Sequence, residues 1–264
     1  MNSANSTWAL ITGASSGIGE ELARLFAADG VNVALVARRA DRLRGLADEL
    51  AAAHGISAVP LPADLATPEG PRQVMQELTD RSIDIDDLVN NAGFGSNGPF
   101  AATDLQSQLD MVQVNVGSLV HLTGLLLPDM LRRGRGRILN VASTAAFQPG
   151  PRMAVYYATK AFVLHFSEAL YEESRRQGVT VTCLCPGPTR TEFAEAAAMQ
   201  DAPLFRLRPM SAAAVAKAGY RAMQRGKPLV IPGVANRLLA SSVRFMPRWL
   251  VRKVVKRLNG GHLR

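Results

Sequence analysis

The sequence of 264 residues predicts an α/β fold, a single doubly wound parallel sheet of about seven strands with helices on both faces and a basic helical extension at its C-terminus. Short apolar runs alternate with longer segments of helical periodicity along most of the chain. The runs are almost continuously apolar, which is typical of strands that are buried on both faces of a parallel sheet. Hydrophobic residues make up 47% of the chain, enough for a sizeable core.

The first strand leads into a glycine-rich segment. The apolar run Trp8–Ile11 is followed by residues 12–19, Thr-Gly-Ala-Ser-Ser-Gly-Ile-Gly, and then by a helical pattern. Glycines allow a tight turn and close backbone approach, and the free N–H groups at a helix N-terminus attract phosphate. In this strand–turn–helix context, residues 12–19 predict a phosphate-binding turn.

The second strand, Val31–Val36, ends beside two arginines. A unit of this kind that prefers NAD places an Asp or Glu near this point to bind the ribose 2′-hydroxyl. Here Arg38 and Arg39 follow instead, and either guanidinium would pair with the 2′-phosphate of NADP. The alternative is that both arginines are solvated residues at the start of the next helix, Asp41–His54.

The remaining elements continue the alternation. Strands are expected at residues 56–61, 87–90, 137–142, 179–185 and 228–231, and helices at 67–81, 103–133, 153–177, 191–199 and 211–225. Because the carboxyl ends of parallel strands meet at one edge of a sheet, Asn90, Ser143 and Pro186 are expected beside the glycine-rich turn.

Tyr156 and Lys160 lie four residues apart in the helix that follows Ser143, so they share one helix face. The pKa of a free tyrosine is about 10. A cation at about 5 Å, with an effective dielectric of about 20, would stabilise the phenolate by roughly 3 kcal/mol, or about 2 pKa units. We therefore expect Lys160 to bring the pKa of Tyr156 into the range of a general acid or base. A packed ring beside a solvated amine is the alternative.

These motifs together resemble the short-chain dehydrogenase/reductase family over residues 7–232. They occur in the family's order, as Thr12-Gly-Ala-Ser-Ser-Gly-Ile-Gly19, Asn90-Asn-Ala-Gly93, Asn115, Ser143, Tyr156-x-x-x-Lys160 and Pro186-Gly187. The resemblance implies a Rossmann-type fold and hydride transfer between a nicotinamide cofactor and an alcohol or carbonyl. The cofactor it implies is NADP(H) rather than NAD(H).

The resemblance also implies roles for single residues. Tyr156 would donate the proton in reduction, and Lys160 would lower its pKa and hold the nicotinamide ribose. Ser143 would bind the substrate oxygen, and Asn115 would anchor a water between Lys160 and solvent. The cofactor contacts implied are Gly13, Ser15, Ser16, Gly17, Ile18, Gly19, Arg38, Arg39, Asp64, Leu65, Asn91, Ala92, Gly93, Tyr156, Lys160, Pro186, Gly187, Thr189 and Thr191.

Apolar residues around Phe94, Phe147 and Met153, with the segment 191–208, predict a lipophilic carbonyl or alcohol substrate. Two other classes stay open: a scaffold or sensor that binds NADP without catalysis, and a peripheral membrane enzyme that reduces a lipid carbonyl. The four histidines have no metal-ligand spacing, so no metal site is expected. Ser143 lacks the G-x-S-x-G elbow and a nearby histidine, which disfavours acyl transfer.

The last quarter of the chain is strongly basic. Residues 202–264 hold 14 Lys and Arg and no Asp or Glu, whereas residues 1–201 carry a net charge of −6. We expect residues 1–232 to form the NADP-binding catalytic domain and residues 233–264 to form a basic amphipathic extension. Apolar and cationic stripes within residues 247–258 are typical of a helix on an anionic membrane. Packing on its own domain or on a partner subunit, and recruitment of an anionic acyl-CoA or carrier protein, are the alternatives. Nucleic acid is not expected, because aromatic residues are too few.

The N-terminus has no signal-peptide pattern, and no apolar run reaches the length expected of a membrane span. We expect a cytoplasmic protein, with peripheral membrane attachment as the variant. Cys183 and Cys185 are expected on opposite faces of a strand, buried and reduced. Members of the family often pair through the helices that carry Asn115 and Tyr156, so a homo-oligomer is expected.

Overall fold

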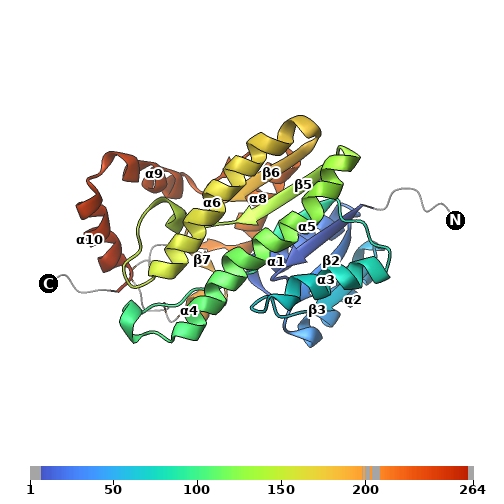
Figure 1. Cartoon of the computed structure of the whole chain (residues 1–264), viewed down its shortest axis with the longest axis horizontal. Helices are drawn as coiled ribbons and strands as arrows, with labels where there is room; N and C mark the ends of the chain where they lie inside the picture. Colours follow the sequence, from blue (N-terminus) through green and yellow to red (C-terminus); the bar gives the residue numbers. More distant parts are fainter. Residues whose placement is uncertain (1–6, 198, 200–202, 204–208, 261–264) are drawn as a thin grey trace.

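A computed structural model of the chain describes residues 7–197, 199, 203 and 209–260. Its seven-stranded sheet is parallel throughout and lies between two layers of helices (Figure 1). In spatial order the strands are β3 (Ala58–Pro62), β2 (Asn32–Ala37), β1 (Trp8–Thr12), β4 (Asp87–Asn90), β5 (Gly136–Val141), β6 (Val179–Leu184) and β9 (Leu229–Val230). The order 3-2-1-4-5-6 is that of dinucleotide-binding doubly wound sheets. The predicted fold class is confirmed.

Helices cover both faces of this sheet. On one face lie α1 (Gly17–Ala28), α2 (Ala40–His54) and α8 (Ala212–Gln224), and on the other lie α3 (Glu69–Asp80), α5 (Ser118–Arg133) and α6 (Ala154–Ser174) (Figure 1). Successive strand residues point to opposite faces. Ile11 and Leu35 therefore belong to the core under α1 and α2, whereas Leu10 and Val36 belong to the core under α3 and α5. The continuous apolar runs thus fill two cores.

The single helix predicted at residues 103–133 is interrupted. A 3₁₀ turn (Phe100–Ala102) precedes α4 (Leu105–Val112), and a π-helical turn (Gln113–Gly117) joins α4 to α5. Asp104, rather than Thr103, caps α4, because its carboxylate accepts a hydrogen bond from Ser107 N at 2.7 Å. The π turn adds a residue to the helix turn and re-aims what it carries. It carries Asn115, which is buried.

Smaller elements complete the fold. The helix predicted at 191–199 is only α7 (Phe193–Ala196), and part of the segment 191–208 lies outside the described residues. Two short strands that the sequence did not predict, β7 (Thr189–Arg190) and β8 (Met210–Ser211), pair in parallel beside the main sheet. Further 3₁₀ turns span Thr144–Phe147, Arg175–Gln177 and Val243–Phe245.

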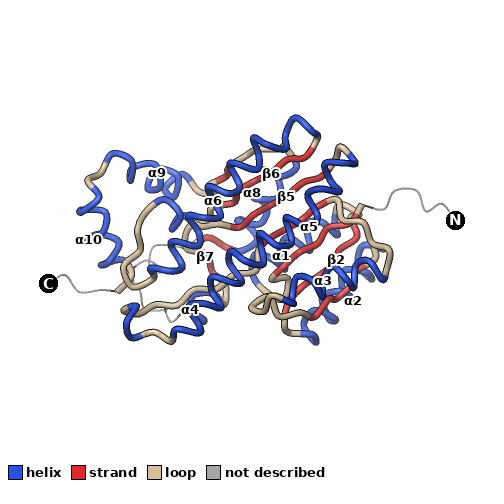
Figure 2. The backbone as a smooth tube through the Cα atoms, viewed as in Figure 1, coloured by secondary structure: helices blue, strands red, loops and turns tan. Residues whose placement is uncertain are grey.

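Residues 233–260 form α9 (Val234–Ser242), the 3₁₀ turn Val243–Phe245 and α10 (Arg248–Leu258). Figure 2 shows α9 and α10 at one end of the molecule, beyond the N-terminal end of α6. The side chains of Val251 and Val255 are buried and belong to the same apolar cluster as Met153 and Tyr157. Val254, from the same predicted stripe, is 42% exposed. The inner face of α10 therefore packs on its own chain. The boundary at residue 232 stays a prediction.

The expectation for the two cysteines was wrong in one respect. The Sγ atoms of Cys183 and Cys185 are only 3.7 Å apart, and both residues are buried in one cluster. Residues two apart on a strand share a face, so opposite faces were not the correct consequence of their spacing. Both thiols are free, as expected.

The sequence expectation about membrane spans also needs correction. By length and composition alone, the stretch Leu105–Arg133 meets the requirements of a membrane-crossing helix, because it contains an 18-residue window with a mean hydropathy of 1.3. Within it, α5 packs Leu122, Leu126 and Met130 into the core under the sheet. A core helix satisfies the same test, and the packing of α5 fits that role.

Candidate active site

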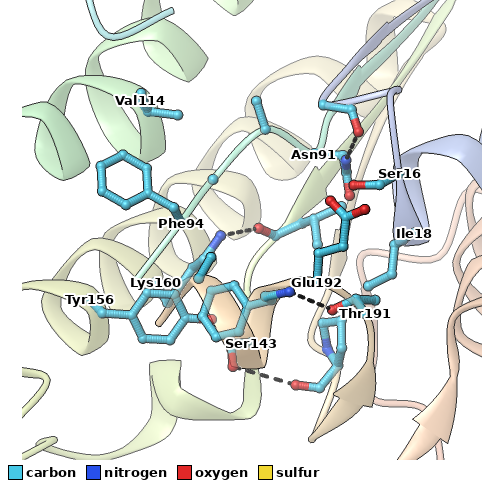
Figure 3. Close-up of a pocket in the computed structure, with 18 of the residues that line it drawn as sticks. Ser16, Ile18, Asn91, Phe94, Val114, Ser143, Tyr156, Lys160, Thr191 and Glu192 are labelled. Atoms are coloured by element: carbon cyan, nitrogen blue, oxygen red, sulfur yellow. Dashed lines mark hydrogen bonds between the residues drawn. The ribbon is translucent and has the colours of Figure 1, made fainter. Parts of the chain in front are cut away.

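A cavity of about 500 Å³ lies at the carboxyl ends of the strands. The residues predicted to bind the cofactor or to carry the catalysis line this cavity, apart from Gly19 and Asn115. Asn90 and Phe147, which the sequence also placed near the site, are not among the lining residues. Figure 3 shows Phe94, Tyr156 and Lys160 on one side, and Ser16, Ile18 and Glu192 on the other. The fold thus brings residues that are far apart in the sequence, from Gly13 to Thr191, into one cavity.

The glycine-rich turn is held tightly against the end of β4. Gly13 and Gly17 have φ angles of 66° and 61°, a region that favours glycine. A Cβ at Gly19 would overlap the carbonyl oxygen of Gly13. The side chain of Asn91 donates to the carbonyl oxygens of Thr12 and Gly13, at 3.0 and 3.2 Å. These contacts hold the backbone of the turn in place. A side chain at Gly19 would therefore clash with it.

The turn fits the phosphates of a dinucleotide. Helix α1 begins at Gly17 with Ser16 as its N-cap, and no side chain among the described residues caps it by a hydrogen bond. The first N–H groups of a helix have no intrahelical partner, and the helix dipole favours an anion there. The cavity beside Ser16 and Gly17 therefore offers an anion free backbone donors.

Beside the end of β2, two arginines share the carboxylate of Glu192, which the sequence did not predict as a site residue. Arg39 donates to Ser15 Oγ at 3.1 Å and pairs with Glu192 at 2.8 Å, and Arg42 pairs with the same carboxylate at 2.6 Å. Hydrogen bonds from Arg42 and Arg39 hold the pKa of Glu192 at about 2. Arg38 also lines the cavity. No local sequence signal links Glu192 to arginines some 150 positions away.

Ser143, Tyr156 and Lys160 converge from β5 and α6. Ser143 precedes a 3₁₀ turn, and its Oγ accepts a hydrogen bond from Ala145 N at 3.1 Å. Lys160 Nζ donates to the carbonyl oxygen of Val141 at 2.7 Å and lies 5.9 Å from the centroid of the Tyr156 ring. Both Tyr156 and Lys160 are buried, at 9% and 5% exposure. The site therefore holds a phenol and an amine out of bulk water.

Burial decides the pKa values of this pair. It raises the pKa of Tyr156 above its usual value, against the opposing effect of a hydrogen bond with Ser143. It also lowers the pKa of Lys160 to about 8. The net shift of the Tyr156 pKa is therefore opposite to the expected one, because loss of hydration is its largest cause. Tyr156 keeps its proton at neutral pH.

Asn115 lies behind the cavity wall. Its side-chain nitrogen donates to Phe94 O and to Thr159 Oγ1, both at 3.0 Å, and its oxygen accepts from Phe94 N at 3.1 Å. A Cβ at Gly93 would lie 2.9 Å from the Asn115 oxygen and 3.3 Å from Lys160 Nζ. Asn115 thus ties the start of the loop after β4 to helix α6.

The end of the cavity away from the glycine-rich turn is apolar. It is lined by Phe94, Met153 and Phe193, and the rings of Tyr156 and Phe193 have centroids 5.3 Å apart. Phe147, which the sequence placed with them, packs instead in the cluster around Cys183. Its place in the 3₁₀ turn after Ser143 directs it away from the cavity. Phe193 lies in the segment 191–208 that the sequence placed at the substrate, although the sequence did not single it out.

Comparison with known proteins identifies the family. The family model described as short chain dehydrogenase matches residues 7–202. A very-long-chain 3-oxoacyl-CoA reductase of Phaeosphaeria nodorum is 39% identical over 183 residues, which cover 67% of this chain and 53% of that protein. The chain therefore spans about half the length of this relative. The Homo sapiens reductase of the same name is 29% identical over 258 residues, or 96% of this chain and 79% of that protein.

Solved structures agree with this assignment. A short-chain dehydrogenase from Sphingobium yanoikuyae in complex with NADPH is 33% identical, with a TM-score of 0.81 and coverage of 90% of this chain and 93% of that one. A bulky-bulky ketone specific alcohol dehydrogenase from Comamonas testosteroni is 28% identical, with a TM-score of 0.77 and coverage of 98% and 97%. The chain belongs to the short-chain dehydrogenase/reductase family.

Proposed function

We propose that this enzyme reduces a lipophilic carbonyl compound with NADPH, and that Tyr156 donates the proton. The convergence of Ser143, Tyr156 and Lys160 beside the glycine-rich turn, in one cavity, is the observation that carries the proposal. A carbonyl oxygen at this place has a hydroxyl from Ser143 and one from Tyr156 to bind it. When bound, the nicotinamide cofactor supplies the hydride that the carbonyl carbon receives.

Each polar side chain then has a part in holding or moving the proton. Because its pKa is raised, Tyr156 stays protonated at neutral pH, which is the form that a donor needs. Lys160 has three N–H donors, and Val141 takes one of them, which leaves others for the hydroxyls of the nicotinamide ribose. Its lowered pKa of about 8 lets the amine exchange a proton near neutral pH. Asn115 supports this geometry from behind, and we retain the proposal that it anchors a water.

Several features favour NADPH over NADH. Ala37 stands where an acidic residue would bind the ribose 2′-hydroxyl, and Arg38 and Arg39 follow it at the cavity. Arg39 already bonds an oxygen of Ser15 and the carboxylate of Glu192, so it is oriented toward anionic and oxygen acceptors. The relative from Sphingobium yanoikuyae was solved with NADPH.

The double variant Arg38→Ala, Arg39→Ala should lose NADPH affinity by at least about 10-fold, because even one charged hydrogen bond to a phosphate contributes about 1.5–3 kcal/mol. NADH affinity should change by less than about threefold, since NADH lacks the 2′-phosphate. Fluorescence titration of both dinucleotides measures this. Arg24→Ala is the matched control, because Arg24 pairs with Glu20 and Glu49 and does not line the cavity. Equal binding of both dinucleotides to the wild type would overturn the assignment.

The substrate class follows from the apolar end of the cavity. Phe94, Met153 and Phe193 offer no charged partner to a substrate, and burial of apolar surface contributes about 25 cal/mol per Å². Two of the similar proteins are named for a very-long-chain acyl thioester and for bulky ketones. We therefore propose a ketone or 3-oxoacyl compound with a long or bulky apolar group.

A second proposal concerns where the enzyme works. The large apolar side chains that the C-terminal extension exposes include Leu238, Leu239, Phe245 and Trp249, at 56–87% exposure. They lie among arginines and lysines in a segment that has no acidic residue. Exposed aromatic and aliphatic side chains among cations are typical of a surface that adsorbs to an anionic bilayer. We propose that this face binds an anionic membrane, where a lipophilic substrate is dissolved.

At about 0.1 M salt, the protein should sediment with anionic vesicles. At about 1 M salt, the amount bound should be at least tenfold lower, because the Debye length falls from about 10 to about 3 Å and the attraction between charges is screened. Phe245→Ser, Trp249→Ser should weaken binding at low salt. Phe162→Ser removes an exposed aromatic from α6 instead and should bind as the wild type does. Failure of the wild type to sediment at low salt would contradict membrane adsorption.

A further inference from the structure

Helix α10 ends in a buried polar residue. Asn259 is only 1% exposed. Its side-chain oxygen accepts from the hydroxyl of Tyr157 at 3.2 Å, and its side-chain nitrogen donates to the carbonyl oxygen of Pro151 at 3.0 Å. Its own carbonyl oxygen accepts from the side chain of Asn97 at 2.9 Å, and its N–H bonds Val255 O at 3.0 Å. Every polar atom of Asn259 therefore has a partner inside the protein.

Two of these partners lie in loops that reach the cavity. Asn97 belongs to the loop at 94–99 after β4, and Pro151 to the loop at 148–153 before α6. The first loop supplies Phe94 to the cavity lining, and the second supplies Gln148 and Met153. Asn259 thus joins the two loops that line the apolar end. We call Asn259 and its partners Tyr157, Pro151 and Asn97 the C-terminal clip.

A second link between the loops carries backbone strain. Arg152 has a φ angle of 72°, which a residue with a side chain rarely adopts. Its Nε donates to Asn97 Oδ1 at 3.1 Å, and its carbonyl oxygen accepts from Gly98 N at 2.9 Å. A strained conformation persists only where the surroundings determine it. Asn97, which Asn259 also holds, is one of those surroundings.

The clip also contacts the helix that carries the proposed proton donor. Tyr157 follows Tyr156 in α6, and a Cβ at Gly150 would overlap the Tyr157 ring, so the loop backbone lies directly on that ring. Val251 and Val255 of α10 belong to the apolar cluster that includes Met153 and Tyr156. Helix α10 therefore backs the apolar end of the cavity, and no hydrogen bond among the described residues joins the clip to the glycine-rich turn.

From this arrangement we infer that Asn259 is a positioning residue for the substrate. Through the clip, the C-terminal extension holds the loops at 94–99 and 148–153 in the shape that receives the apolar part of the substrate. The inference rests on the proposed function in one respect, namely that the substrate binds at the apolar end of the cavity. Removing the Asn259 amide would leave the buried Tyr157 hydroxyl without this partner and would free the half-buried Pro151 carbonyl, which favours a rearranged loop.

Hydrogen–deuterium exchange of Asn259→Ala tests the clip without any substrate. Amide exchange in both loops should become at least about fivefold faster, because local opening becomes easier, while residues 13–19 should exchange as in the wild type. Asn32→Ala is the control, because it removes an asparagine side chain that accepts a hydrogen bond from Ser57 N away from the cavity. Tyr157→Phe keeps the ring and should loosen the loop at 148–153 to a smaller extent. Unchanged exchange in both loops, or faster exchange throughout the chain, would overturn the inference.

Kinetics then test the role in substrate binding. With the bulkiest ketone that the wild type reduces, Asn259→Ala should raise KM about tenfold and change kcat by less than about threefold, because the hydroxyls of Ser143 and Tyr156 stay in place. NADPH affinity should not change. Loosened loops with an unchanged KM would overturn the role in positioning. Failure of the wild type to reduce any carbonyl would instead contradict the proposed function, and the exchange measurement separates these two results.

Discussion

Tyr156→Phe should lower kcat for carbonyl reduction by about a thousandfold, since a positioned general acid contributes about 10²–10⁴-fold. The variant keeps the ring that packs against Phe193 and removes only the hydroxyl. The wall of the cavity is thereby preserved, and NADPH affinity should stay within about twofold of the wild type. Steady-state kinetics together with a fluorescence titration of NADPH measure both quantities.

Tyr171→Phe provides the control for this experiment. Tyr171 lies on the same helix, α6, but it does not line the cavity. Its loss of a hydroxyl should leave kcat and NADPH affinity unchanged. A Tyr156→Phe enzyme that keeps a tenth or more of the wild-type kcat would rule out Tyr156 as the proton donor.

The second large effect is expected from Gly19→Ala. The added Cβ would overlap the carbonyl oxygen of Gly13 and lie 2.8 Å from its carbonyl carbon, and it would also overlap the side chain of Asn91. Backbone atoms cannot turn aside as a flexible side chain does. The turn should therefore open, with loss of NADPH affinity by about 100-fold or more and a lower Tm, since a distorted turn no longer aims its N–H groups at the phosphates.

Gly45→Ala is the matched control. Gly45 lies in α2, and an added Cβ there meets no atom within 4 Å. Replacing a helical glycine by alanine stabilises a helix by about 1 kcal/mol, so Tm should rise by about 2–4 °C. NADPH affinity should not change. If Gly19→Ala binds NADPH as tightly as Gly45→Ala does, the close packing of the turn is not needed for binding.

Features that depend on local sequence could be predicted. The strand that ends at Thr12, the glycine-rich turn and the start of α1 lie within twenty residues, and each has its own signal in residue type and spacing. Tyr156 and Lys160 share a helix face for the same reason. The sheet order follows once the alternation of strands and helices is recognised, because few doubly wound arrangements are possible.

Features that depend on the packed structure could not be predicted from the sequence. Hydrophobic periodicity does not distinguish a π turn from an α-helix, so the interruption that carries Asn115 was missed. The pKa of Tyr156 moved opposite to expectation because the sequence gives the nearby cation but not the degree of burial. Glu192 meets Arg39 across 153 positions, and Asn259 meets Tyr157 across 102, with no local signal for either contact.

Transfer of a labelled hydride would test the central claim most directly. The wild-type enzyme would be incubated with NADPH carrying deuterium at the transferable position and with ketones and 3-oxoacyl thioesters of increasing chain length. We expect one molecule of alcohol for each NADPH consumed, deuterium on the carbinol carbon, and faster turnover with the longer apolar substrates. Tight binding of NADPH with no consumption across the whole series would contradict the reductase, and would leave a protein that binds the cofactor without catalysis.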